Sequence, residues 1–513
     1  MVFKFDAQRI SWPTAAFLAL SAAVYIIISA AYVIAGQIHV DEGAYLYAAN
    51  RVMAGDLPYR DFFYLQAPLH PYIYGPVQQV FGASLITGRI TSATFGLLAN
   101  LLAIWVAWKI KPTWTTIAAA AGLIAWNSYQ LYFFTITRLY ALTAFWLSLG
   151  AAALVWERIA GRWRDLAAAI CLGLAISTRL TVLPAMAAFA MVLIAQHWRQ
   201  TWRWLVPIAA GSAVTAAIFL PFVLAAREQL YFNILGLNLS LHSRDLIANL
   251  TQKARSLAHL VRNLLFPLMI IVWALAATAP GWKCWRVKLT GCWPRLTLWS
   301  WILAITAGHL AAKIFQESYQ SLLYPLFAAL IAAEAAHALE QIALTPRMRR
   351  ALCQAFCTGC LLMLIAYGRQ SLAHIDGRLP TRILSDQAEL VRSLTSPGDV
   401  LFSADTALVA VEAGRELLPG MAGSDYFPDW PTDKCRRYRV TNDEILSEYL
   451  TNGRAKVVVV GGLSFTLSLP LLEPVPDEKR ARLFELIATH YEFVREYPNI
   501  MVPGTVTRIY HRR

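Results

Sequence analysis

Long apolar runs, separated by short polar connections, fill the first two thirds of the chain. A run of about 17–25 apolar residues is long enough to cross the ~30 Å hydrocarbon core of a bilayer as an α-helix. We therefore predict about eleven membrane-spanning helices. They fall near residues 14–36, 84–108, 113–128, 138–156, 165–179, 181–197, 204–225, 257–279, 296–314, 319–339 and 350–367.

The connection after the first run, residues 38–83, is much longer than the others near it and is rich in Tyr and Phe. Two stretches within it, Asp41–Ala54 and Leu69–Phe81, have an amphipathic pattern that predicts helices lying at the membrane interface. Long loops are often functional. The first run itself is too long for a signal-peptide core and leads directly into charged sequence, which predicts an uncleaved anchor.

From residue 369 to residue 513 the pattern changes to short alternating or buried runs that predict strands. The predicted strands are Asp399–Asp405, Lys456–Val460 and Val506–Tyr510. Helical patterns lie between them near 383–395, 443–452 and 477–490. This alternation predicts a small α/β domain at 369–513, after a multi-span domain at 1–368. Gly461-Gly462 lacks the spacing of a nucleotide-binding turn and is expected to be an ordinary turn.

The composition excludes a soluble globule, because 58% of the residues are hydrophobic and 15% are charged. The net charge of +14 is unevenly placed: the first 368 residues hold 27 Lys/Arg and 12 Asp/Glu, and the rest hold 18 and 19. Basic residues among apolar runs indicate membrane topology, with no nucleic-acid partner. The seven cysteines suggest neither a disulfide framework nor a metal site.

Basic residues concentrate in alternate short connections, which predicts that the N-terminus is cytoplasmic. Eleven spans then place the loop 38–83 and the domain 369–513 outside. This pattern is typical of a bacterial plasma (inner) membrane protein.

Asp41 and Glu42 lie directly after the first predicted span. Two adjacent carboxylates at a bilayer surface indicate a functional site, and the start of a helix favours their ionised form. The alternative is structural, with Asp41 as the helix N-cap and Glu42 as a first-turn residue. Composition alone does not separate the two interpretations.

The sequence from Asp41 to Gly75 is DEGAYLYAANRVMAGDLPYRDFFYLQAPLHPYIYG. It resembles the first outer loop of polyprenyl-phosphate-dependent glycosyltransferases with the GT-C fold, which include protein O-mannosyltransferases and the aminoarabinose and galacturonic acid transferases that modify lipid A. The resemblance extends over most of the chain, through the basic end of a middle helix, a Tyr-x4-Tyr-Pro motif at Tyr319 and the outer α/β tail. The first-loop motif is the specific part.

The resemblance implies transfer of a single hexose or pentose from a polyprenyl-phosphate donor to an acceptor hydroxyl outside the membrane, with inversion. Asp41 matches the general base of the family, and Glu42 would orient the loop or contact the acceptor. The chemistry agrees with one base, because a phosphate leaving group needs no general acid while the acceptor hydroxyl must lose its proton. On the same resemblance, the acceptor would be a glycan, lipid or protein of the cell envelope.

The leaving phosphate requires cations placed at the outer ends of helices. Arg179 matches the family's basic residue after Gly-Leu-Ala-x-x-Thr, here Gly173–Thr178. The predicted phosphate-binding residues are Arg179, Arg138, Lys313 and Arg89. For each, the alternative is a snorkelling residue that only marks the interface. The predicted substrate-binding residues are Asp61, Arg60, His70, Gln316, Glu317 and Tyr319.

One departure from the family concerns a metal. Several relatives carry an acidic residue shortly after the position of Arg138, where this chain has Leu139-Tyr140. We therefore expect no metal site and no required cofactor, with a divalent cation left open.

Two other function classes fit a multi-span chain. A transporter or flippase of a lipid-linked sugar is the chief rival, but the charges cluster at helix ends, and no matched pair of broken helices indicates an inverted repeat. An oligosaccharide ligase or polymerase would carry its long catalytic loop late in the chain. The position of the long loop favours the transferase.

Overall fold

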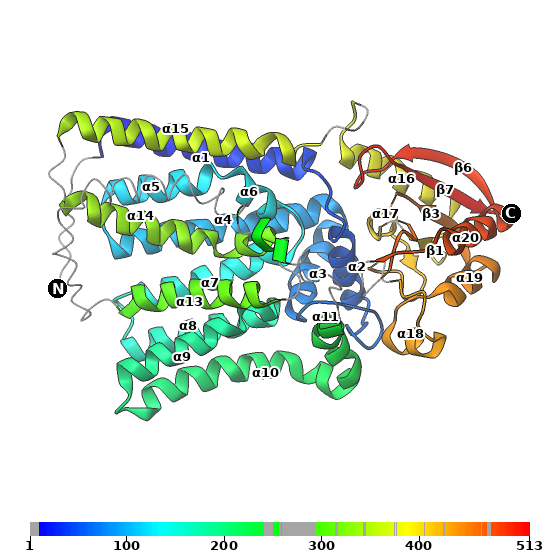
Figure 1. Ribbon diagram of the computed structural model, residues 1–513, viewed down its shortest axis with the longest axis horizontal. Helices are drawn as coiled ribbons and strands as arrows, with labels where there is room; N and C mark the ends of the chain where they lie inside the picture. The colour runs from blue at the N-terminus through cyan, green and yellow to red at the C-terminus, as the bar shows by residue number, and fades with distance from the viewer. Residues whose placement is uncertain are drawn as a thin grey trace.

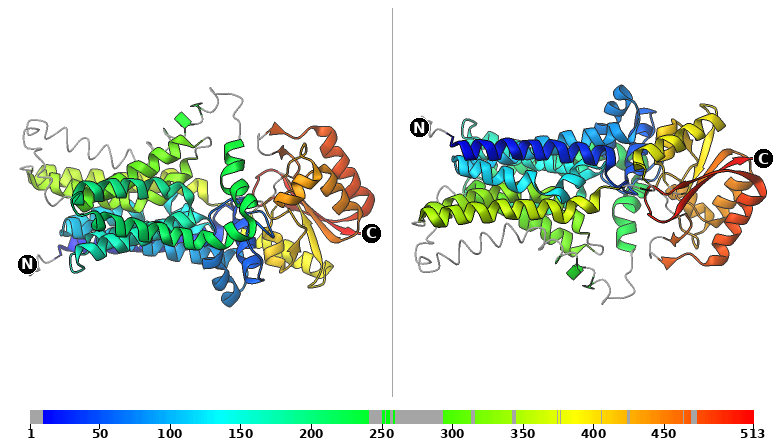
Figure 2. Two further views of the ribbon diagram at one scale, coloured as in Figure 1. Left: turned by 90° about the horizontal axis from the view of Figure 1, so that it is seen from below. Right: turned by 90° about the horizontal axis from the view of Figure 1, so that it is seen from above.

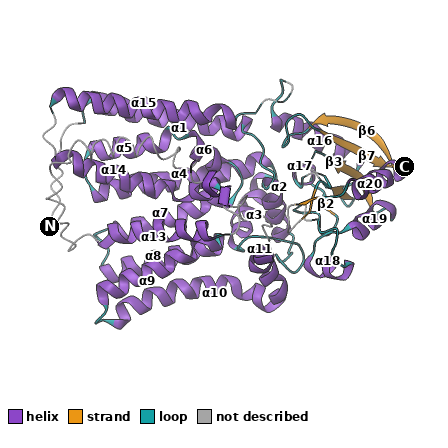
Figure 3. Cartoon of the chain, viewed as in Figure 1, coloured by secondary structure: helices purple, strands orange, loops and turns teal. Residues whose placement is uncertain are grey.

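A helical bundle and a small α/β unit lie at opposite ends of the molecule, with short helices between them (Figure 1). The computed structural model describes residues 10–240, 250–251, 253–255, 258, 293–312, 316–341, 345–373, 375, 377–404, 406–423, 426–462, 464–468 and 473–513. Strands occur only at the C-terminal end of this described part (Figure 3).

The structure describes eleven bundle helices, of which all except α6 coincide with ten of the predicted apolar runs. They are α1 (Trp12–Ala35), α4 (Leu85–Ile110), α5 (Trp114–Ala125), α6 (Ser128–Thr135), α7 (Leu139–Val155), α8 (Gly161–Thr178), α9 (Leu183–His197), α10 (Thr201–Tyr231), α13 (Trp293–Ala311), α14 (Tyr324–Gln341) and α15 (Pro346–Ser371). The run at 257–279 lies outside the described residues except for residue 258.

Six helical segments of the described chain are long and apolar enough to cross a membrane, or seven if the bent pair α6–α7 forms one span. Large apolar side chains are exposed on the sides of the bundle, such as Ile26 at 65% and Leu224 at 77%. In water this surface would be costly, whereas acyl chains solvate it. The chain is therefore an integral membrane protein, and the count of eleven spans stays a prediction.

Small residues bring the bundle helices close together. A Cβ atom on Gly173 of α8 would lie 2.4 Å from the carbonyl oxygen of Gly211 in α10, so the two backbones touch. Such small-residue contacts are a common way to pack helices in a membrane. This contact fixes the C-terminal end of α8, where Arg179 follows.

The long connection after α1 folds as the sequence predicts. It contains α2 (Glu42–Met53) and α3 (Leu69–Phe81), which match the two amphipathic stretches. Both lie between the bundle and the α/β unit in perpendicular views (Figure 2). The short π-helical segment η2 (Phe232–Gly236) and α11 (Leu237–Ser240) extend α10 into the same layer.

The C-terminal unit is a mixed five-stranded sheet in the order β2-β1-β3-β7-β6. β1 (Val400–Ser403) pairs in parallel with β2 (Glu416–Leu417) and β3 (Ala455–Val460), while β7 (Val506–Arg512) is antiparallel to β3 and β6 (Tyr491–Pro498). β4 (Leu467–Ser468) pairs antiparallel with β5 (Glu473–Pro474) in a separate two-stranded sheet.

The helices of this unit are α16 (Pro380–Leu394), α17 (Leu408–Ala413), α18 (Thr432–Tyr438), α19 (Asp443–Thr451) and α20 (Asp477–His490). The three predicted strands and three predicted helices all coincide with observed elements. Gly461 follows β3 in a turn, where its N–H donates to Ser464 Oγ at 2.8 Å. The predicted domain boundary at 368/369 falls within the last turn of α15, which ends at Ser371.

Candidate active site

Asp41 lies at the start of α2, where it faces a cation from another part of the chain. Its Oδ2 atom is 2.7 Å from Nη2 of Arg138, the residue that precedes α7 at the bend between α6 and α7. The Asp41 side chain makes no capping hydrogen bond to α2. The structural alternative, in which Asp41 serves only as the helix N-cap, is therefore not supported. The Asp41 side chain is 39% exposed, whereas the Arg138 side chain is 7% exposed. The carboxylate is therefore paired and still accessible.

His39 completes this corner of the site. Its Nε2 atom lies 3.1 Å from Nη1 of Arg138, and the backbone N–H of Asp41 donates to its Nδ1 atom at 3.2 Å. Burial, and then the positive charge of Arg138, lower the pKa of His39. The imidazole is therefore neutral at physiological pH and holds the chain just before Asp41.

Glu42 is placed differently from its neighbour, because it is fully buried against Arg89. Arg89 Nε donates to Glu42 Oε2 at 2.9 Å and Arg89 Nη2 to Oε1 at 2.7 Å. The backbone N–H groups of His39 and Thr137 also donate to this carboxylate, at 2.9 and 3.0 Å. Burial disfavours the charged form, but Arg89 and these hydrogen bonds outweigh it and lower the pKa of Glu42.

The remaining donors of Arg89 are also taken. Its Nη1 atom donates to the carbonyls of Tyr32 and Gly36 at 3.1 and 3.0 Å, and Nη2 donates to that of Gln37 at 3.1 Å. The buried pair thus joins the end of α1, the start of α2, α4 and the residue before Arg138. This geometry does not favour the phosphate-binding role predicted for Arg89, or direct contact of Glu42 with an acceptor.

Arg179 approaches the same region from the end of α8. Its Nε donates to Thr181 Oγ1 at 3.0 Å, and its Cζ lies 4.5 Å from the centre of the Tyr319 ring. The guanidinium groups of Arg138 and Arg179 both lie over the ring of Tyr140, at 4.9 and 5.1 Å. Two cations from different loops therefore meet at one aromatic side chain, beside Asp41.

Both arginines are only 6% exposed, and Nε of Arg138 is a buried donor without a hydrogen-bond partner. Both guanidinium groups contact the Tyr140 ring, and an anion that reached both would offset the repulsion between their positive charges. Arginine also presents donors in the geometry that suits phosphate. The chemistry of this cluster therefore fits a phosphate group next to a carboxylate base.

Among the other predicted residues whose side chains the structure describes at the start of the late helix, Tyr319 is the one brought into this cluster. Tyr319 lies in the 3-10 segment η4 (Glu317–Leu323), and Gln316 is exposed just before it. The side chain of Glu317 and all of Lys313 lie outside the described residues.

Three further predicted residues lie in the same long connection, and none of them pairs with Asp41 or with either arginine of the cluster. Arg60 is exposed and pairs with Asp61, Nη2 to Oδ2 at 2.7 Å. Asp61 also accepts from the N–H of Leu57 at 2.8 Å, which holds the turn of the loop. His70 is fully buried and stacks on Tyr74 at 4.0 Å, and burial lowers its pKa to about 3. Their contacts support the loop.

Sequence reasoning named Tyr319 but missed two other residues close to the cations, Tyr140 and His309. Tyr140 bonds through its hydroxyl to Ser318 Oγ at 2.9 Å, which links α7 to η4. His309 of α13 is buried, and its Nε2 lies 3.0 Å from Thr181 Oγ1. The position of Tyr140, two residues after Arg138, was a local sign that this ring could contact Arg138. Its contact with Arg179 could not be read from the sequence, because Arg179 is distant along the chain.

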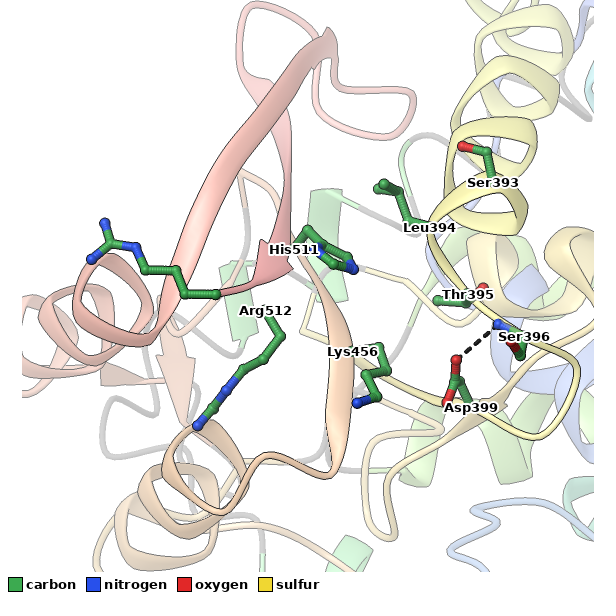
Figure 4. Close-up of a pocket in the computed structure, with 9 residues that line it drawn as sticks. Ser393, Leu394, Thr395, Ser396, Asp399, Lys456, His511 and Arg512 are labelled. Atoms are coloured by element: carbon green, nitrogen blue, oxygen red, sulfur yellow. Dashed lines mark hydrogen bonds between the residues drawn. The ribbon is translucent and has the colours of Figure 1, made fainter.

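A separate hollow of about 430 Å³ lies at the amino ends of β1 and β3 (Figure 4). Lys456 and His511 face Asp399 and the end of α16 across it, and Asp399 accepts from the N–H of Ser396 at 2.8 Å. This is the end of the parallel strands opposite to the one that approaches α2, so it is not part of the Asp41 cluster.

Across the described part of the chain, no three His, Cys, Asp or Glu side chains are grouped to hold a metal ion.

Comparisons with known proteins support the fold. No protein-family model and no curated protein sequence matches the chain. Two crystal structures of ArnT from Cupriavidus metallidurans do match it, one in the apo state and one bound to undecaprenyl phosphate. The apo structure is 15% identical with a TM-score of 0.61, covering 97% of this chain and 98% of that one. The bound structure is 13% identical with a TM-score of 0.63, covering 96% and 97%. The similarity confirms the GT-C fold.

Proposed function

We propose that this chain is an inverting glycosyltransferase that moves one sugar from a polyprenyl-phosphate donor to an acceptor hydroxyl outside the membrane. The observation that carries the proposal is the Asp41 carboxylate, accessible and paired with one of two arginines that share the Tyr140 ring. A carboxylate supplies the base and two guanidinium groups supply the phosphate site. The fold is shared with a protein that binds undecaprenyl phosphate.

The proposed reaction needs one base and one anion site. Asp41 accepts the proton of the acceptor hydroxyl as its oxygen attacks C1 of the donor sugar, and the bond from C1 to the phosphate oxygen breaks on the opposite face. The phosphate leaves with the bonding electrons, and Arg138 and Arg179 stabilise its charge. Polyprenyl phosphate and the glycosylated acceptor are the products, with the anomeric centre inverted. Each atom and electron is supplied by the two substrates and Asp41, so no cofactor is required.

Glu42 and Arg89 have a supporting role in this proposal. Glu42 of this buried pair holds the backbone N–H of His39, two residues before Asp41, and that of Thr137, directly before Arg138. A base that must lie within about 3 Å of its proton depends on such support. We place the site at the outer face of a bacterial plasma membrane, with the N-terminus inside and the α/β unit outside.

The phosphate site is tested by Arg179→Gln. A hydrogen bond to a charged group contributes about 1.5–3 kcal/mol, so binding of undecaprenyl phosphate is expected to weaken by about 10- to 100-fold. Binding would be measured with the purified protein in lipid nanodiscs. Arg199→Gln is the matched control, because Arg199 is exposed beside Trp198 after α9. Equal binding by wild type and Arg179→Gln would exclude Arg179 from the phosphate site.

A further inference from the structure

The C-terminal α/β unit and the acidic outer loop share one hydrophobic core. Ile38 and Leu46, on either side of Asp41, belong to the same buried cluster as Leu401 of β1 and Leu408 of α17. Tyr47, Phe63 and Leu85 join it from the outer loop and the start of α4. A unit joined only by a flexible linker would bury its core within itself. Here the folded core includes the helix that follows Asp41.

A close backbone contact between the α/β unit and the outer loop lies at Gly43, two residues after Asp41. A Cβ atom at this position would lie 2.8 Å from the backbone nitrogen of Leu408 and 2.8 Å from Oγ1 of Thr406. Real Cβ atoms do not approach a backbone nitrogen so closely, so only glycine lets α2 and the start of α17 touch in this way.

The surface that Gly43 contacts is itself firmly held. Ser403 Oγ at the end of β1 donates to the carbonyl of Thr406 at 2.7 Å, and the N–H of Leu408 donates to Thr406 Oγ1 at 3.2 Å. β1 lies inside the sheet, between β2 and β3. The turn containing Thr406 and Ala407 is therefore a rigid extension of the sheet, directed at α2 from the carboxyl end of a parallel strand.

Two polar links lie on either side of this contact. Tyr47 Oη accepts from the N–H of Leu417 at 3.1 Å, which fixes the middle of α2 to β2. Glu412 Oε1 of α17 accepts from the N–H of Leu85 at 2.6 Å, at the first residue of α4. Arg89 lies one turn further along α4 and holds Glu42. The α/β unit thus contacts both helices that carry the buried Glu42–Arg89 pair.

We propose that α17 and the turn before it, through Gly43 and Glu412, position the acidic loop so that Asp41 stays against Arg138. Gly43, Thr406 and Glu412 are positioning residues. The α/β unit holds α2 and the start of α4 in place, and so fixes the position of Asp41. This inference rests on the proposed function for its kinetic consequence, but its structural consequence is independent of that function.

Gly43→Ala tests the contact, because the added methyl group forces α2 and α17 apart. Displacing a reacting group by about 1 Å can cost 100-fold in rate. We expect kcat for sugar transfer to fall by about 10- to 100-fold with the donor KM nearly unchanged, because Arg138 and Arg179, which follow α6 and α8, are not displaced with α2. Amide hydrogen exchange in residues 42–53 is expected to rise about tenfold or more, because α2 loses its packing. Gly398→Ala is the matched control, since a Cβ atom there meets nothing within 4 Å.

Substitutions of Glu412 test the same positioning role without adding an atom at the contact between α2 and α17. Glu412→Gln keeps an acceptor oxygen for the N–H of Leu85 and is expected to retain wild-type kcat, whereas Glu412→Ala is expected to lower it. If Gly43→Ala fails to fold, this pair decides the question. If the wild type transfers no sugar, the proposed function fails, and exchange of residues 42–53 in the same variants decides the inference. Wild-type exchange and kcat in both Gly43→Ala and Glu412→Ala would overturn it.

Discussion

Asp41→Asn is expected to slow sugar transfer by about 100-fold or more, because general-base catalysis typically contributes 10²–10⁴-fold. The amide has nearly the same shape and still accepts a hydrogen bond from Arg138, but it cannot take up the proton of the acceptor hydroxyl. Donor binding should be retained, because the phosphate contacts come from Arg138 and Arg179. The measurement is the rate of polyprenyl phosphate release by purified wild type and variant, with binding of undecaprenyl phosphate measured on the same samples.

A carboxylate far from the site provides the control for this prediction. Asp477 begins α20, and its side chain is 97% exposed beside Arg480. Asp477→Asn should transfer sugar at the wild-type rate. If Asp41→Asn folds, binds the lipid and is as fast as this control, Asp41 is not the base.

Glu42→Ala is expected to destabilise the protein by about 3–5 kcal/mol, because it leaves the Arg89 guanidinium buried without a counter-charge. Both side chains are completely buried, so water cannot replace the lost carboxylate. The backbone N–H groups of His39 and Thr137 lose their acceptor in the same change. Thermal unfolding in detergent and the yield of folded protein would show the effect.

The double variant Glu42→Leu/Arg89→Met separates the loss of a partner from the loss of the pair. Removing both charges avoids the unpaired buried cation, and such replacements in other proteins are often neutral or stabilising. We expect the double variant to be more stable than Glu42→Ala. If Glu42→Ala is as stable as the wild type, the Glu42–Arg89 pair does not support the loop. Substitutions at these adjacent carboxylates thus have different expected effects: loss of rate at Asp41 and loss of stability at Glu42.

Residue patterns alone do not separate Asp41 from Glu42; only the resemblance to the GT-C glycosyltransferases assigned the base to Asp41 and an orienting or acceptor-contacting role to Glu42. Both are acidic and both follow a membrane span, and successive helical residues point about 100° apart. Which one turns inward depends on Arg89 in α4, a distant helix. In the same way, Arg89, Arg138 and Arg179 all looked like cations at outer helix ends. Only the tertiary structure distinguishes Arg89, which is buried against Glu42, from Arg138 and Arg179, which lie over the Tyr140 ring.

Local patterns predicted the elements themselves well. The amphipathic stretches became α2 and α3, and the alternating or buried runs became β1, β3 and β7. β6 was missed because its sequence, YEFVREYP, places charged residues along much of an edge strand. Contact between the α/β unit and Gly43 was equally invisible, because a single glycine in a helix carries no local sign of what approaches it.

The most direct test of sugar transfer uses the wild-type protein in proteoliposomes, with a polyprenyl-phosphate sugar and an extract of outer-envelope acceptors. A transferase with Asp41 as its base predicts that polyprenyl phosphate is released only when the acceptor is present, while the sugar appears on the acceptor. Accumulation of intact lipid-linked sugar in the opposite leaflet, without release of polyprenyl phosphate, would contradict this function and favour a flippase.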